Sequence, residues 1–217
     1  MTRLAVFDCD GTLVDSQANI GRACVAAFEA SALPPPPIAA IRRIVGLSLV
    51  EAMQVLAPTL DPGAHQRLAS DYKLAFHAFR ASGTLDPEPL FEGIVETIDA
   101  LLSADWVLGV ATGKSDRGLA AVLAHHGLAD RFVTLQTADR HPSKPDPAML
   151  FAAMADAGAR PHMTAMIGDT SFDMAMAQAA GVRAIGVAWG YHAPQELVDA
   201  GADAVADHAR DLPEMLA

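Results

Sequence analysis

Two carboxylates, those of Asp8 and Asp10, follow directly after an apolar run over residues 4–7. Such a run is typical of a strand buried on both faces. If the chain stays extended, the period of two places both carboxylates on one side and Cys9 on the other. Two negative charges this close repel each other unless a cation lies between them or one acid is protonated. The pair therefore predicts a metal site with chemistry at the end of the first strand.

Four further polar residues lie at or beyond the ends of later apolar runs: Thr112, Lys144, Asp169 and Asp173. Carboxylate oxygens completed by water suit Mg²⁺. A carboxylate whose charge is screened by a cation can attack phosphorus and form an aspartyl-phosphate. A second acid can give a proton to the leaving oxygen and take one from water. This set of residues predicts phosphoryl transfer, with a hydroxyl and an ammonium binding the phosphate.

Two kinds of pattern must position these residues. Residues 16–85 contain only helical patterns, over 16–31, 38–45, 49–56 and 64–82, and Ser16 is placed to cap the first of these helices. Helices then alternate with strands over 106–111, 132–136, 164–167, 183–188 and 204–206. This alternation predicts an α/β fold with a doubly wound, Rossmann-like parallel sheet, whose ligands bind beyond the carboxyl ends of the strands. We expect a core domain of residues 1–15 and 86–217 and an inserted all-helical cap domain of residues 16–85.

Charge and composition restrict the partners. The chain has 217 residues and a formal net charge of −11, which argues against a nucleic acid or an anionic membrane as partner. Its two cysteines, Cys9 and Cys24, have no paired or metal-ligand spacing and favour a reducing cytoplasm. The N-terminus predicts no signal peptide. We expect a cytoplasmic protein, monomer or homodimer, acting on a small phosphorylated metabolite.

Four segments together carry a family resemblance: Asp8-Cys9-Asp10-Gly11-Thr12-Leu13-Val14-Asp15-Ser16, Thr112, Ser143-Lys144-Pro145-Asp146-Pro147 and Gly168-Asp169-Thr170-Ser171-Phe172-Asp173. They resemble, in order and position, the four motifs of the haloacid dehalogenase-like (HAD) hydrolases. Within that superfamily the chain is similar to the phosphoglycolate phosphatase and beta-phosphoglucomutase branch, which has a helical cap. The resemblance implies a HAD-like core and a Mg²⁺-dependent phosphatase, with phosphoglycolate as the leading substrate.

The resemblance also implies roles for individual residues. Asp8 would be the nucleophile and Asp10 the acid and base. Thr112 and Lys144 would bind the phosphate. Mg²⁺ would be held by Asp8, the backbone carbonyl of Asp10, and Asp169, with Asp173 close behind.

Further positions near the expected site have competing interpretations. Many relatives have Thr-Asn-Lys where this chain has Thr112-Gly113-Lys114, so Gly113 removes an amide from the phosphate site. In the expected cap, Arg43 could reach a substrate carboxylate or second phosphate, and Gly46 would let its backbone approach the substrate. For Arg43 and for its neighbour Arg42, a solvated helix face is the competing interpretation.

Other activities remain open on the same residues. A dehalogenase is disfavoured, because those relatives lack an acid at the position of Asp10. A phosphomutase fits the same scaffold, and a phosphonate hydrolase would need a Schiff-base lysine in the cap, where Lys73 is the one lysine and stands far from the first motif. A non-catalytic protein that binds phosphate or a cation is the alternative from a different class.

Overall fold

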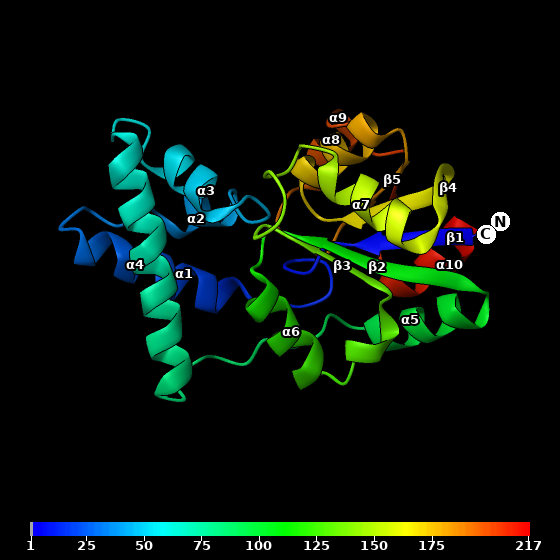
Figure 1. Cartoon of the computed structure of the whole chain (residues 1–217), viewed down its shortest axis with the longest axis horizontal. Helices are drawn as coiled ribbons and strands as arrows, with labels where there is room; N and C mark the ends of the chain where they lie inside the picture. Colours follow the sequence, from blue (N-terminus) through cyan, green and yellow to red (C-terminus); the bar gives the residue numbers. More distant parts are fainter. Residues whose placement is uncertain (1) are drawn as a thin grey trace.

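Six parallel strands form one sheet in the order β3-β2-β1-β4-β5-β6 (Figure 1). The structure is a computed structural model and describes residues 2–217. The strands are β1 (Thr2–Phe7), β2 (Trp106–Thr112), β3 (Thr134–Thr137), β4 (Ala159–Gly168), β5 (Arg183–Val187) and β6 (Ala204–Ala206). The first strand of the chain thus lies inside the sheet, and the order reverses beside it. This is the doubly wound α/β fold that the alternating pattern predicts.

Helices cover both faces of the sheet (Figure 1). They are α5 (Ile94–Ser103), α6 (Asp116–His125), α7 (Ala148–Ala157), α8 (Ser171–Ala180), α9 (Pro194–Asp199) and α10 (Leu212–Leu216), with short 3₁₀ turns at η1 (Ala129–Arg131) and η2 (Ala209–Asp211). Alternate residues of β1 enter different hydrophobic clusters: Ala5 and Phe7 pack with α5, α6 and α10, whereas Leu4 and Val6 pack with α7 and α8. The continuous apolar run of β1 is therefore explained by burial on both faces.

Several strand and helix bounds differ from the sequence prediction. Strand β4 begins at Ala159, five residues before the predicted start, and residues 160–162 of it are exposed. Strand β3 begins at Thr134 rather than at residue 132, because the η1 turn extends to Arg131 and the chain needs the next two residues to enter the sheet. Helix α9 was not predicted. Exposed strand ends and short helices bury little apolar surface, so they leave a weak periodic signal.

Residues 16–85, here called the helical segment, contain α1 (Gln17–Ala30), α2 (Ile38–Arg42), α3 (Leu49–Leu56) and α4 (Pro62–Ala81). The segment has its own hydrophobic cluster, which includes Phe28, Met53 and Leu68, and Tyr191 joins this cluster from outside the segment. In Figure 1 the helical segment lies at the side of the sheet where the strands end. Helix α2 stops at Arg42 rather than at residue 45, and a turn leads to Gly46, whose φ is +99°. The division into a core and a cap domain at residues 15 and 85 stays a prediction.

Within the part of the chain that the structure describes, no helix is both long enough and apolar enough to cross a membrane.

Candidate active site

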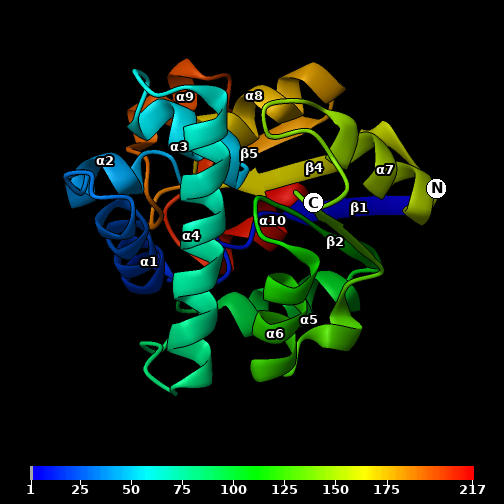
Figure 2. The same cartoon turned by 60° about the vertical axis from the view of Figure 1, so that its left-hand side comes forward.

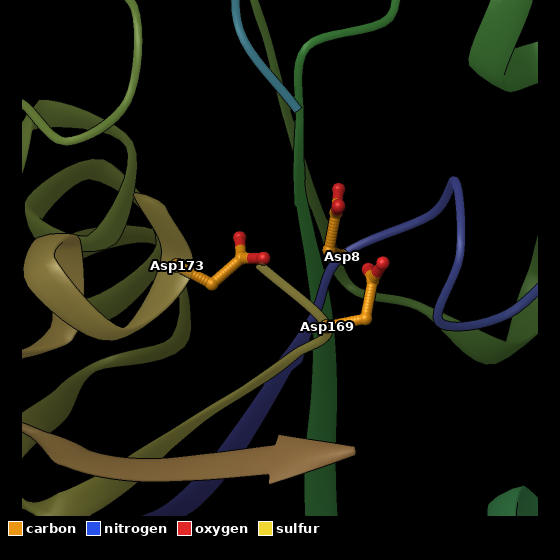
Figure 3. Close-up of side chains that lie close together, drawn as sticks. All are labelled: Asp8, Asp169 and Asp173. Atoms are coloured by element: carbon orange, nitrogen blue, oxygen red, sulfur yellow. The ribbon is translucent and has the colours of Figure 1, made fainter. Parts of the chain in front are cut away.

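Three carboxylates meet at the carboxyl ends of the two central strands (Figure 3). Asp8 follows β1, Asp169 follows β4, and Asp173 lies in the first turn of α8. One oxygen of each lies within 4.8 Å of one oxygen of the other two, and all three side chains are fully buried. The sheet topology thus brings together residues that are far apart in the sequence.

The carboxylate of Asp8 is the least satisfied of the three. Among the described residues, neither of its oxygens receives a hydrogen bond of good geometry. Its one ionic neighbour is Lys144, whose Nζ lies 2.9 Å from Oδ1. Burial raises the pKa of Asp8 to about 7; Lys144 opposes the shift, and the nearby charges of Asp173 and Asp10 add to it. A buried carboxylate with free lone pairs is available to a cation and to an electrophile.

Lys144 contacts two of the acids, Asp8 and Asp173. Its Nζ lies 2.6 Å from Oδ1 of Asp173, and its side chain is fully buried. Burial by itself lowers the pKa of Lys144, but Asp173 and Asp8 outweigh that effect and raise the pKa above its ordinary value. The ammonium is therefore held as a fixed positive charge beside Asp8.

The other two carboxylates have more partners. Asp169 accepts hydrogen bonds from the Thr12 hydroxyl at 2.9 Å and from the backbone N–H of Tyr191 at 2.9 Å, one on each oxygen. Burial and the charge of Asp8 nevertheless raise its pKa well above the ordinary value. Asp173 accepts two hydrogen bonds from Thr170 on the oxygen that Lys144 does not contact, which forms the capping box of α8. The carboxylate of Asp173 therefore has the most hydrogen-bond and ionic partners of the three.

This donor set fits a divalent metal ion. Three buried carboxylates face one another with a single buried ammonium among them, and the two oxygens of Asp8 lack hydrogen bonds from the described residues. Hard oxygen ligands of this kind suit Mg²⁺. A cation would also offset the repulsion that raises the pKa of Asp8 and Asp169. Asp8 and Asp169 are the better placed ligands, since Asp173 is occupied by Lys144 and Thr170.

Asp10 stands apart from these carboxylates and has its own partners. Its Oδ1 lies 2.7 Å from Nζ of Lys114 and accepts a hydrogen bond from the Ser16 hydroxyl. Ser16 occupies the N-cap position of α1, but its side chain makes no capping hydrogen bond there, contrary to the role expected from the sequence. The reason is that the hydroxyl turns to Asp10 instead.

Sequence reasoning missed Lys114 and Ser16 as partners of Asp10. Lys114 was noted only within the Thr112-Gly113-Lys114 segment. The signal that was available is its position two residues beyond Thr112, at the same edge of the sheet. Burial lowers the pKa of Lys114, but the stronger effect of Asp10 and other acids raises it above the ordinary value.

Thr112 and Gly113 lie where β2 ends. The Thr112 hydroxyl is buried and accepts a hydrogen bond from the backbone N–H of Lys114 at 3.2 Å, which leaves its own O–H free to donate. A Cβ added at Gly113 would lie 2.7 Å from the carbonyl oxygen of Leu47 and 2.8 Å from that of Gly46. The helical segment therefore reaches the end of β2 so closely that only glycine fits at this position.

Two arginines of the helical segment, Arg42 and Arg43, contact the loop after β5 and the helix beyond it. Arg43 pairs with Glu196 of α9 at 2.7 Å and is exposed. Arg42 donates a hydrogen bond to the backbone carbonyl of Gly190 at 2.7 Å and lies over the ring of Tyr191. Both side chains hold the helical segment against the rest of the molecule, and a role of Arg43 in substrate binding stays a prediction.

Further hydrogen bonds join the helical segment to the edge of the sheet where the strands end and the carboxylates lie. This edge is here called the catalytic edge. The backbone N–H of Ser48 donates to the Ser143 hydroxyl at 2.8 Å, next to Lys144. His192 accepts a hydrogen bond from the Ser171 N–H on Nδ1, and its Nε2 lies 3.2 Å from the Arg43 carbonyl oxygen. The loop over residues 42–48 and Ser16 at the start of α1 are thus parts of the helical segment that contact the site.

Comparison with known proteins identifies the family of this arrangement. Residues 5–187 match the family described as haloacid dehalogenase-like hydrolase. A protein described as the probable phosphatase IndB of Dickeya dadantii is 36% identical over 212 residues, covering 95% of this chain and 90% of that protein. Phosphoglycolate phosphatase 1 of Pseudomonas aeruginosa is 30% identical over 217 residues, covering 98% of this chain and 79% of its own length.

Solved structures share the fold over the whole chain. A hydrolase from Pseudomonas syringae superposes with a TM-score of 0.85 at 25% identity, covering 100% of this chain and 98% of its own. A haloacid dehalogenase-like family protein from Streptococcus pneumoniae superposes with a TM-score of 0.85 at 22% identity, covering 100% and 99%. The predicted HAD-like fold is confirmed.

Proposed function

The chain belongs to the haloacid dehalogenase-like hydrolase family, and on this premise we propose that it is a Mg²⁺-dependent phosphatase of a small phosphomonoester. The observation that carries the proposal is the carboxylate of Asp8. It is buried, has no hydrogen bond of good geometry from the described residues, and lies between a fixed ammonium and two further carboxylates. Such a group is costly to bury and has no evident structural role, which favours a catalytic one.

The first step forms a covalent intermediate on this carboxylate. An oxygen of Asp8 attacks phosphorus, the bond to the alcohol oxygen breaks, and Asp10 gives that oxygen a proton. Lys144 and the Thr112 hydroxyl bind the non-bridging phosphate oxygens and stabilise their charge. When bound by Asp8, the Asp10 carbonyl and Asp169, with Asp173 close behind, Mg²⁺ supplies positive charge that lets two anions approach each other.

The second step restores the enzyme. Asp10 takes a proton from a water molecule, which attacks the phosphorus of the aspartyl-phosphate and releases Asp8 and inorganic phosphate. Lys114 and Ser16 both contact Oδ1 of the Asp10 carboxyl and hold it in place, so they act as positioning residues. The two acids thus divide the work: Asp8 reacts with phosphorus and Asp10 moves protons.

Phosphate release with and without EDTA tests the proposal. Phosphoglycolate is the reference substrate, because several relatives are named as phosphoglycolate phosphatases. We expect release with Mg²⁺, loss in EDTA, recovery when Mg²⁺ is restored, and no release by Asp8→Asn. Retained turnover in Asp8→Asn would contradict the nucleophile assignment. No release by the wild type over a wide panel of phosphomonoesters would favour a non-catalytic binding protein.

One observation supports a phosphonate hydrolase as the second candidate. Lys73 of α4, expected to stand far from the first motif, lines the same cavity as Asp10. A lysine there could form a Schiff base with an aldehyde-bearing phosphonate. Borohydride trapping of such a substrate would label the wild type and not Lys73→Arg; absence of labelling would exclude this activity.

A further inference from the structure

A cavity of about 340 Å³ lies between the helical segment and the catalytic edge of the sheet. On the side of the sheet it is lined by Asp10, Gly113 and Lys114, whereas Asp8 and Asp169 do not line it. In the proposed mechanism Asp10 protonates the leaving oxygen. The cavity therefore begins where the alcohol part of the substrate would lie.

The opposite wall of the cavity is largely hydrocarbon and aromatic. Helix α4 packs against both α1 and α3, and Figure 2 shows it crossing the face of the helical segment. All four helices and the loop after α2 contribute apolar side chains to the wall: Ile20, Ile41, Val45, Met53, Tyr72 and Phe76. Of these, Ile20, Ile41, Val45 and Met53 are buried. A wall of this kind binds apolar groups, because contact with them removes both surfaces from water.

The charged groups of the cavity lie elsewhere. Lys73, His77 and Arg117 also line it and are exposed, whereas Arg80 and Glu88 of the lining are half-buried, with the guanidinium of Arg80 over the ring of Phe76. Lys114, whose side chain is 11% exposed, is already paired with Asp10 at 2.7 Å. Tyr72 faces this pair, and burial raises the pKa of its hydroxyl above the ordinary value. A carboxylate on the substrate would therefore compete with Asp10 for Lys114 or lie toward the more exposed cations, away from the apolar wall.

From this wall and this volume we propose that the substrate is the phosphate ester of an apolar alcohol, with an aliphatic chain or aromatic ring that fills the cavity. The inference rests on the proposed phosphatase function and names its substrate class. Glycolate is far smaller than the cavity and would leave most of the apolar wall in contact with water. An apolar group gains free energy from the same burial.

A homologous series of esters tests the substrate class. Ethyl, butyl, hexyl and benzyl phosphate release alcohols of similar intrinsic reactivity, so differences in kcat/KM report contact with the wall. We expect kcat/KM to rise by about two- to fourfold for each added methylene until the cavity is filled. Phosphoglycolate should fall below butyl phosphate. A flat series, or a clear preference for phosphoglycolate, would overturn the inference.

A matched pair of variants on α4 tests whether the apolar wall causes the preference for apolar esters. Phe76 lines the cavity, whereas Phe79 is not among its lining residues and lies under the guanidinium of Arg22. We expect Phe76→Ala to lower kcat/KM for hexyl and benzyl phosphate by about tenfold, with ethyl phosphate changed less than about twofold. Phe79→Ala should leave the whole series unchanged. Phe76→Leu, which keeps a large apolar side chain, should be intermediate and serves if the alanine variant folds poorly. An equal loss over all esters would contradict the assignment of this wall.

The two proposals fail in different ways. Release of phosphate from all the esters without preference for the apolar ones would overturn the substrate class and leave the phosphatase function standing. No Mg²⁺-dependent release from any ester would overturn both. Inhibition by hexanol and benzyl alcohol gives a second readout, and we expect both alcohols to compete with substrate in the wild type and more weakly in Phe76→Ala.

Discussion

The catalytic edge of the sheet and the helical segment above it hold their functional groups by different means. At the edge, Asp8, Lys144 and Asp173 are fully buried and joined by ion pairs, and Asp169 is held by a hydroxyl and a backbone N–H. The helical segment contributes an apolar wall and contacts the edge through the loop over residues 42–48 and through Ser16. Buried polar groups demand a fixed geometry, whereas apolar contacts accept many shapes. On the proposals above, the reaction depends on the fixed polar groups of the sheet and the choice of substrate on the apolar contacts of the helices.

The largest effect should follow from removing the cation at the edge. Lys144→Met leaves several buried acids without their ammonium. Breaking a buried pair in this way costs about 3–5 kcal/mol, so we expect a lower free energy of unfolding in urea and a loss of most activity. Lys73→Met, on the exposed side of α4, is the control and should leave the unfolding curve unchanged. A Lys144→Met variant as stable as the wild type would show that the edge is not held by its charges.

The next effect concerns pH in metal-free protein. The pKa of Asp8 is raised to about 7 from an ordinary value of 3.8. Between these values the folded state binds more protons than the unfolded state, so stability should fall as pH rises from about 4 to about 7 in EDTA. The expected loss in the free energy of unfolding is on the order of a few kcal/mol. Urea unfolding at each pH measures it, and both Mg²⁺ and Asp8→Asn should flatten the slope. If the free energy of unfolding of Asp8→Asn still depended on pH in this range, other titrating groups would be responsible.

A smaller effect is expected where the two regions touch. Gly46 has φ +99°, and a Cβ there would lie 3.4 Å from the Thr170 hydroxyl oxygen. Gly46→Val should displace the loop from Gly113 and lower kcat/KM by about tenfold, while the core stays folded. Gly158→Val is the matched control, since Gly158 also has a positive φ but no atom lies within 4 Å of its added Cβ. Similar losses of activity in both variants would mean that backbone strain alone is responsible.

The smallest effect should come from the exposed pair of Arg43 and Glu196. A hydrogen bond from Arg43 lowers the pKa of Glu196 to about 2, so any stabilisation is present above the ordinary value of 4.5 and is lost as pH falls toward 2. Surface pairs contribute little, and Arg43→Ala should change kcat/KM less than about twofold. A rise in KM of tenfold or more with phosphoglycolate, with stability unchanged, would instead support the predicted contact of Arg43 with a substrate carboxylate.

Much of the fold could be predicted because its signals are local. The apolar run before Asp8, the alternation after residue 91 and the ordered motifs together predict the sheet, and the helices of the helical segment follow from their 3.6-residue period. The exposed start of β4 and the short helix α9 could not be predicted, because neither buries a regular apolar face. The site assignments of Asp8, Asp10, Thr112, Lys144, Asp169 and Asp173 remain predictions about chemistry, even though their positions are now defined.

The sequence by itself determined which residues could do chemistry and that they would meet, because parallel strands end at one edge of a sheet. Only the tertiary structure decided how they are paired. It placed Lys114 and Ser16 on Asp10, Lys144 between Asp8 and Asp173, and the backbone of Gly46 against Gly113. These pairings depend on side-chain directions and on the approach of segments far apart in the chain, neither of which has a signature in the spacing of residues.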